Sequence, residues 1–179
     1  MSVYANPAFS SETTPDHYSS TVLEQLGSRD PLAVLESLPI ALANEITGLG
    51  REQMRQSEGP GKWSMIEVIQ HLADSELVWA YRLRLVLAED RPHLTGYDQD
   101  EWARRLDYSE SSLEEAFDQI RNLRTANLRL LKSLTQDQLQ RVGIHQERGP
   151  ETVEHMIRLY AGHDLIHRRQ LSRIRSRVS

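Results

Sequence analysis

The sequence contains no cysteine. This absence excludes disulfide bonds, thiolate metal ligands and a cysteine nucleophile of the protein's own, so any metal site must use histidine, aspartate or glutamate. Long apolar runs are also missing, since none approaches the roughly 20 residues that cross a bilayer. The N-terminal stretch MSVYANPAFSSETTPDHYSS lacks the basic and apolar regions of a signal peptide. We therefore expect a cytoplasmic protein that contacts no membrane.

An excess of positive charge is missing as well, because the 179 residues carry a formal net charge of −5. Proteins that bind nucleic acids present basic surfaces, so we expect no nucleic-acid partner. Arginines gathered near the C-terminus suit the negative end of a helix dipole instead; they are Arg168, Arg169, Arg173, Arg175 and Arg177. Apolar residues make up 39% of the chain and charged residues 26%, which is typical of a soluble protein with one core.

The first 29 residues are rich in serine, threonine and proline and show no apolar period. We expect them to form a flexible arm that contains a helical turn at Val22–Leu26. Residues 30–179 should form one domain. Its first helix should begin after Asp30, which can act as an N-cap, and should break or restart at Pro39.

The clearest helix start is GKWSMIEV, where Ser64 and Glu67 have the spacing of a capping box. This helix should run from about Met65 to Ala88. Two further helices are expected, from Ser111 or Ser112 to Leu134 and from Thr152 to Arg175. The connection after Ala88 is long, about 20 residues, which indicates a crossover or a functional lid. No segment shows the alternation of a strand, so we predict an all-α four-helix bundle with a long crossover between helices 2 and 3.

Two histidines lie four residues apart in the stretch YAGHDLIHRRQL. In a helix, His163 and His167 leave one face about one turn apart. The residues before and after them on that face are apolar, so both imidazoles should point into the core. His71 lies on or beside the apolar stripe of the helix that follows Ser64. Three neutral imidazoles from two facing helices would provide three metal ligands and leave one position open, as in catalytic sites.

Such a site suits zinc, nickel, iron or manganese. The alternative interpretation is that these histidines only form hydrogen bonds in the core and bind no metal. His145, in the connection before the last helix, could approach the mouth of the site. The other three histidines fit the pattern less well; they are His17, His93 and His155.

Three stretches resemble the DinB/YfiT-like superfamily of four-helix-bundle metalloenzymes: GKWSMIEVIQHLADSE, YDQDEWARRLDY and GPETVEHMIRLYAGHDLIHRRQL. The resemblance spans about residues 30–176. It implies that His71, His163 and His167 are the metal ligands. It also implies a metal-centred bundle rather than a DNA binder. Members with assigned chemistry include S-transferases that use bacillithiol or mycothiol, a mycothiol-dependent maleylpyruvate isomerase, and metal-dependent hydrolases.

We therefore expect a metal-dependent enzyme that acts on a small molecule, either a thiol-dependent S-transferase or a hydrolase. Its cofactor would be a divalent ion, Zn²⁺ or Ni²⁺ before Fe²⁺ or Mn²⁺, and a transferase would also use a low-molecular-weight thiol as cosubstrate. Members of the family are often dimers, and a homodimer could form through the first bundle helix or the Trp79 side of the second. The alternative is a non-catalytic, metal-dependent binding or stress-response bundle of unknown ligand.

Several other residues are candidates for supporting roles. Asp74, three residues after His71, could orient an imidazole, and Asp164 directly follows His163. Glu147 and Arg148 could face a substrate. An enzyme also needs a cleft over the open metal position, which we expect aromatic residues of the long connection to line in part; they are Tyr97, Trp102 and Tyr108. If the connection instead seals the metal, a non-catalytic role is expected.

Overall fold

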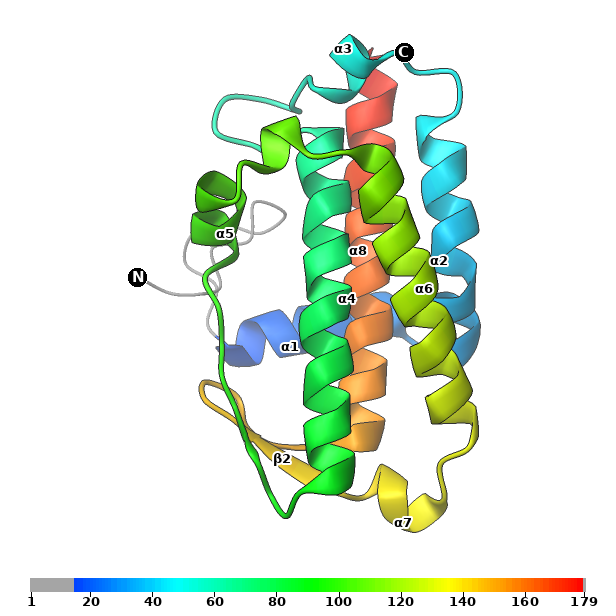
Figure 1. The fold of residues 1–179 in the computed structure, drawn as a ribbon, viewed down its shortest axis with the longest axis vertical. Helices are drawn as coiled ribbons and strands as arrows, with labels where there is room; N and C mark the ends of the chain where they lie inside the picture. Colours follow the sequence, from blue (N-terminus) through cyan, green and yellow to red (C-terminus); the bar gives the residue numbers. More distant parts are fainter. Residues whose placement is uncertain (1–14, 179) are drawn as a thin grey trace.

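The computed structural model describes residues 15–178. Four of its helices are long and pack together as a bundle (Figure 1). Their bounds are Pro31–Ile46 for α2, Met65–Ala88 for α4, Leu113–Lys132 for α6 and Val153–Val178 for α8. The predicted four-helix bundle is therefore confirmed. Among the described helices, none is both long and apolar enough to cross a membrane.

A long connection joins α4 to α6, so that these two helices run in the same direction (Figure 1). It passes along the outside of the bundle, as the predicted crossover requires. The connection holds three short elements, which are β1 (His93–Leu94), α5 (Gln99–Arg105) and the 3-10 turn η1 (Tyr108–Glu110). Two other short helices lie outside it, namely α3 (Arg51–Met54) and α7 (Gln136–Leu139).

The helix starts follow the local sequence signals. Ser64 Oγ accepts a hydrogen bond from the Glu67 backbone N–H at 3.4 Å, and a Glu67 carboxylate oxygen accepts from the Ser64 N–H at 2.7 Å. The capping box predicted for α4 is therefore present. Ser112 Oγ similarly accepts from the first turn of α6, and Asp30 caps α2. These side chains replace hydrogen bonds that the first turn of a helix cannot make within itself.

The predicted break at Pro39 was wrong, because α2 continues through this residue to Ile46. Proline has no N–H, so it leaves the carbonyl four residues earlier without its helical donor. That carbonyl belongs to Leu35, and it accepts a hydrogen bond of 2.8 Å from the guanidinium of Arg124 on α6. A neighbouring helix therefore supplies the donor that Pro39 lacks.

The prediction that the chain contains no strand was also wrong. Besides β1, the structure contains β2 (Val142–His145) and β3 (Gly149–Thr152), joined as an antiparallel hairpin, and β2 pairs in parallel with β1. Gly143 lets this sheet approach α4 closely, because a Cβ atom there would lie 2.6 Å from the Val86 side chain. The sheet closes the end of the bundle at which α8 begins (Figure 1).

A further helix, α1 (Pro15–Leu26), crosses α8. Val22 and Leu26 are fully buried, so this part of the expected flexible arm is packed against the bundle. Gly162 permits the contact, since a Cβ atom there would lie 2.2 Å from the Val22 carbonyl oxygen. The expectation for residues 1–14 lies outside the described residues. The helix α1 thus lies against α8 beside His163.

Two large apolar clusters follow one another along the bundle axis, and a smaller third cluster joins α1 to α8. The helix α4 contributes residues 65–73 to one cluster and residues 79–86 to the other. Likewise, α8 contributes residues 153–161 to the second cluster and Leu171 and Ile174 to the first. Buried polar and ionisable side chains occupy the layer between them. This layer contains the candidate site.

Candidate metal centre

Three buried imidazoles meet in the polar layer of the bundle. His71 comes from α4, and His163 and His167 come from successive turns of α8. Their ring centroids are 4.4 to 5.3 Å apart, and one nitrogen of each ring lies within 4.8 Å of the others. The structure thus brings together the three histidines singled out in the sequence, at a separation that one metal ion could bridge.

The protonation of His167 is set by its neighbour on α8. The carboxamide oxygen of Gln170 lies 2.9 Å from Nδ1 of His167 and accepts a hydrogen bond from it. The proton therefore resides on Nδ1, and Nε2 presents a lone pair. This Nε2 atom is buried and has no hydrogen-bond partner among the described residues. An oriented imidazole with a bare nitrogen is the form that binds a metal.

The other two imidazoles face each other. The Nε2 atoms of His71 and His163 are 3.2 Å apart, and only one of them can donate a hydrogen bond if both rings are neutral. Burial lowers the pKa of both rings well below the usual value, and neighbouring imidazoles lower it further. Burial also lowers the pKa of His167, to about 4. At neutral pH all three rings are therefore uncharged and able to act as ligands.

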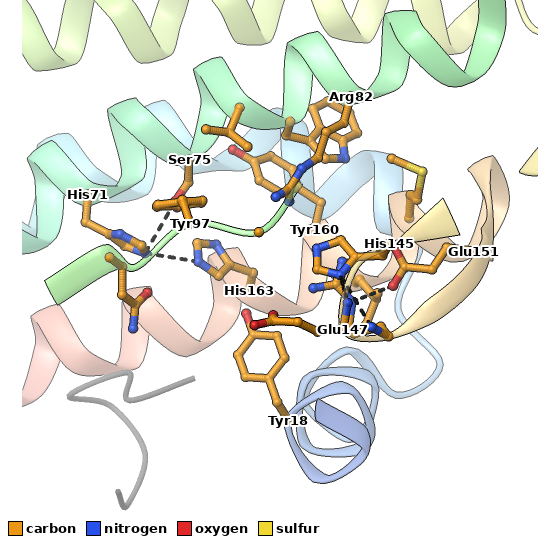
Figure 2. Close-up of a pocket in the computed structure, with 17 residues that line it drawn as sticks. Tyr18, His71, Ser75, Arg82, Tyr97, His145, Glu147, Glu151, Tyr160 and His163 are labelled. Carbon is orange, nitrogen blue, oxygen red and sulfur yellow. Dashed lines mark hydrogen bonds and ion pairs between the residues drawn. The ribbon is translucent and has the colours of Figure 1, made fainter. Parts of the chain in front are cut away.

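A cavity lies beside the imidazoles, and His71 and His163 form part of its wall (Figure 2). Its water-accessible volume is about 130 Å³, far more than the roughly 10–15 Å³ that one water molecule needs on the same measure. The remaining wall comes from further residues of α4 and α8, from α1, from the long connection and from the β2–β3 hairpin; the labelled residues are Tyr18, Ser75, Arg82, Tyr97, His145, Glu147, Glu151 and Tyr160. The cluster therefore has access to a space that can hold a small molecule.

The aromatic residues of the long connection take different places. Tyr97 lines the cavity, and its hydroxyl lies 3.0 Å from Ser75 Oγ. Trp102 packs against the Tyr97 ring with centroids 4.5 Å apart, behind the cavity wall. Tyr108 is buried elsewhere and donates a hydrogen bond of 2.6 Å to Asp74. Of these three aromatic residues only Tyr97 lines the cavity, next to Gly96 and Gln99 of the same connection, and the connection leaves the cluster unsealed.

Asp74 was predicted to orient an imidazole, and the structure places it in another role. Its carboxylate accepts hydrogen bonds from Tyr108, Gln70 and Gln119. In the described part of the chain it bonds to no histidine. Burial and the adjacent carboxylate together raise the pKa of the Tyr108 hydroxyl, so this hydroxyl remains a donor. Asp74 therefore joins α4 to η1 and α6, and the orienting role belongs to Gln170.

His145 and its neighbours form the end of the cavity at the β2–β3 hairpin. Nδ1 of His145 accepts from the backbone N–H groups of Glu147 and Arg148, at 3.2 and 3.4 Å. Burial lowers the pKa of His145 to about 3, with Arg148 and Arg82 contributing, so this ring stays neutral. Arg148 forms a two-pronged ion pair with Glu151. His145, Glu147 and Arg148 thus line the cavity, as the sequence suggested, whereas the other three histidines lie outside the cluster.

A buried ionic network beside the cluster was missed in the sequence. Arg124, on α6, is 2% exposed and contacts two fully buried carboxylates, Asp164 at 2.7 Å and Glu76 at 2.7 Å. Glu76 also accepts from the Tyr160 hydroxyl and from Asn127. Burial raises the pKa of Asp164 to about 6, and Arg124 opposes this. The available signal was the presence of charged residues at core positions of α4 and α6.

Tyr160 links this network to the cavity and the cluster. Its ring stacks on Trp79, with centroids 4.4 Å apart, and lies 5.8 Å from the His163 ring at an interplanar angle of 9°. Trp79 is 6% exposed, so it is a core residue whose ring is not open to another subunit. The large apolar side chains exposed on α4 are instead Leu77 and Tyr81.

Comparison with known proteins places the chain in a family. A protein from Oceanobacillus iheyensis is 34% identical over 133 residues, covering 74% of this chain and 77% of the relative. A protein from Halalkalibacterium halodurans is 30% identical over 129 residues, covering 72% and 75%. Both carry the name "putative metal-dependent hydrolase".

The fold has a solved counterpart in YfiT from Bacillus subtilis, described as a probable metal-dependent hydrolase with an unusual four-helix bundle topology. The two chains align with a TM-score of 0.77 and 22% identity, over 94% of this chain and 91% of YfiT. At this identity the likeness bears on the fold alone. The sequence profile of the DinB superfamily matches residues 33–171. This protein therefore belongs to the DinB superfamily.

Proposed function

We propose that this protein is a metal-dependent hydrolase of a small molecule and that His71, His163 and His167 hold its divalent ion. The observation that carries the proposal is the meeting of three buried, neutral imidazoles, two of which line a cavity. The names of the relatives from Oceanobacillus and Halalkalibacterium support the same reaction class. Zn²⁺ and Ni²⁺ are the ions that we expect first, since both bind imidazole readily, followed by Fe²⁺ and Mn²⁺.

The three imidazoles do not satisfy one another's hydrogen bonds, whereas a bound cation would satisfy their nitrogens. Nε2 of His167 is buried without a partner among the described residues, and the Nε2 atoms of His71 and His163 compete for one hydrogen bond. Buried polar atoms without partners are costly. A divalent ion would accept a lone pair from each ring. Three neutral ligands would leave its charge uncompensated and a position open for substrate or water.

A bound ion would supply Lewis acidity and make water a nucleophile at neutral pH. The rest of the chemistry falls to the protein's own side chains. Gln170 fixes the ring of His167 through Nδ1. Apolar side chains of the cavity wall exclude water from part of the substrate; they are Val78, Met156 and Leu159. Because the cavity is small, we expect the substrate to be a small molecule rather than a polymer.

Metal analysis of protein purified without chelators is the first test. We expect about one divalent ion per chain, and loss of that ion in His71→Ala and His167→Ala. His93→Ala is the matched control, because His93 is an exposed histidine on β1 and should leave the metal content unchanged. Wild-type protein that takes up no divalent ion even when one is added would overturn the proposal.

Hydrolysis is tested with the metal-loaded protein and a panel of small esters, amides and lactones, with and without low-molecular-weight thiols. Turnover by the wild type that needs no thiol and is lost in His167→Ala supports hydrolysis. Turnover that depends on one added thiol would replace it with S-transfer. Stoichiometric metal without any turnover would favour a non-catalytic, metal-dependent binding or stress-response role.

A further inference from the structure

Two hydroxyl groups form a hydrogen-bonded pair at the edge of the imidazole cluster (Figure 2). Ser75 Oγ lies 3.3 Å from Nε2 of His71 and 3.0 Å from the hydroxyl of Tyr97. Both residues line the cavity. They come from different elements, since Ser75 is one turn after His71 on α4 and Tyr97 belongs to the long connection. The crossover thus places a second hydroxyl beside the one that α4 supplies through Ser75.

The Tyr97 side chain is fixed at both ends. Ser75 holds its hydroxyl, and Trp102 packs against its ring. Burial raises the pKa of Tyr97, although the hydrogen bond with Ser75 opposes this, so the O–H bond is intact at neutral pH. A donor already held in place needs no reorganisation during a reaction, which is the condition for strong stabilisation of developing charge.

We propose that Tyr97 is a catalytic residue whose O–H donates a hydrogen bond to the carbonyl oxygen of an acyl substrate, and that Ser75 positions it. This inference rests on the proposed hydrolase function. An acyl compound fits, because a neutral hydroxyl donor suits an oxygen that is uncharged in the substrate and gains charge only during the reaction. Ester, amide and lactone carbonyls all have this property.

The reaction needs no further reactant. The oxygen of water bonds to the carbonyl carbon, the π electron pair moves to the carbonyl oxygen, and the attacking water loses one proton. Tyr97 stabilises the negative oxygen through its hydrogen bond and keeps its own proton. When the carbonyl double bond forms again, the bond to the leaving group breaks, and the leaving group takes up the proton. Acyl compound and water thus give a carboxylic acid and the protonated leaving group.

The test measures binding, so that no substrate has to be known. Acetohydroxamate, which presents an acyl oxygen to a metal, is titrated into Co²⁺-loaded protein and followed by the visible spectrum of the metal. We expect Tyr97→Phe to raise the dissociation constant about 10-fold, the effect of one lost hydrogen bond to a charged acceptor, at unchanged metal content. Ser75→Ala should raise it less, because the Tyr97 hydroxyl is then only less well placed.

Two controls make the result specific. Imidazole binds a metal but offers no oxygen to Tyr97, so its affinity should be the same in wild type and Tyr97→Phe. Tyr108→Phe removes the hydroxyl of another buried tyrosine of the same connection, which bonds Asp74 outside the cavity, and should leave acetohydroxamate affinity unchanged. With an ester substrate, Tyr97→Phe should lower kcat about 100-fold and change KM little.

The outcomes separate the two proposals. If the wild type binds no Co²⁺ at the histidines, the metal-dependent function fails, and this inference fails with it. If the wild type binds Co²⁺ and acetohydroxamate, and Tyr97→Phe binds acetohydroxamate equally well, only the role of Tyr97 is overturned. An equal loss in Tyr108→Phe would also overturn it, because the effect would then come from the connection as a whole.

Discussion

The Gln170 carboxamide oxygen accepts a hydrogen bond of 2.9 Å from Nδ1 of His167. Both residues lie on α8, three positions apart, so one helical turn carries a ligand candidate and the group that orients it. The orientation leaves Nε2 of His167 bare and directed away from Gln170. Because the ring is set before any ion arrives, metal binding should cost little ordering of this side chain.

Replacing Gln170 should therefore weaken metal binding without abolishing the fold. In Gln170→Leu we expect metal affinity to fall about 10- to 100-fold, because loss of a group that orients a ligand has effects of this size. Titration against a competing chelator measures it. Gln119→Leu is the control, since this glutamine of α6 bonds to Ala73 and Asp74 instead. Equal losses in the two variants would contradict the orienting role.

Acid should destabilise the metal-free protein. Burial lowers the pKa of His167 to about 4 and that of His145 to about 3, from an ordinary value of 6.5, and lowers those of His71 and His163 as well. As the pH falls below 6.5, the unfolded chain binds more protons than the native one, so the free energy of unfolding decreases. At pH 4, His167 alone accounts for roughly 3 kcal/mol of this decrease. Asp164 acts in the opposite direction. Because its pKa is raised to about 6, this carboxyl binds a proton more readily in the native chain than in the unfolded one.

Urea unfolding of metal-free protein between pH 8 and pH 4.5 measures this dependence. His167→Leu should give a shallower decrease below pH 6.5 than the wild type, because one buried imidazole no longer titrates. His93→Gln removes an exposed histidine and should keep the wild-type slope. A wild-type free energy of unfolding that stays constant over this range would rule out the predicted burial of neutral rings.

Loss of Arg124 should be strongly destabilising. In Arg124→Met, Glu76 and Asp164 would remain buried without their cation, and removal of one partner of a buried ion pair typically costs about 3–5 kcal/mol. Urea unfolding at pH 7 measures the change. The control is Arg121→Met, one turn earlier on α6, because its ion pair with Asp118 is exposed and should contribute at most about 1 kcal/mol. Similar losses in the free energy of unfolding in both variants would contradict a larger contribution from the buried network than from the exposed ion pair.

A methyl group at Gly162 should displace α1. The added Cβ would lie 2.2 Å from the Val22 carbonyl oxygen, so one of the two helices must move. We expect Gly162→Ala to destabilise the protein by about 1–3 kcal/mol, the range for overpacking, and to speed proteolysis within residues 15–26. Gly59→Ala is the control, because a Cβ atom at Gly59 would have no neighbour within 4 Å among the described residues. Unchanged proteolysis of α1 would contradict the close contact.

The sequence predicted the bundle well because its helices carry strong local signals. The Ser64–Glu67 capping box marks the start of α4, and the adjacent serines Ser111 and Ser112 mark the start of α6 to within one residue. The convergence of three histidines was also predictable, since each lies on the apolar stripe of a long helix. What local pattern could not show was whether a polar residue at a core position finds a partner on another helix.

Two of the errors share that cause. Pro39 reads as a break within its own helix, and only the distant Arg124 shows how the helix tolerates it. Asp74 is well spaced to contact His71, yet Tyr108 from the connection takes its carboxylate. The strands were missed because β2 and β3 have four residues each, which is too short for alternation to be recognised. For Pro39 and Asp74, a tertiary contact overrides the local expectation.

The helix α1 lies before residue 33, where the match to the DinB superfamily begins, yet its Tyr18 lines the same cavity as His71 and His163. One part of the cavity wall thus lies outside the matched segment, whereas the ligand candidates and the rest of the wall lie within it. Proteins that share the imidazoles could therefore admit different molecules by exchanging only this preceding helix. Such an exchange would alter selectivity while the three proposed metal ligands stayed the same.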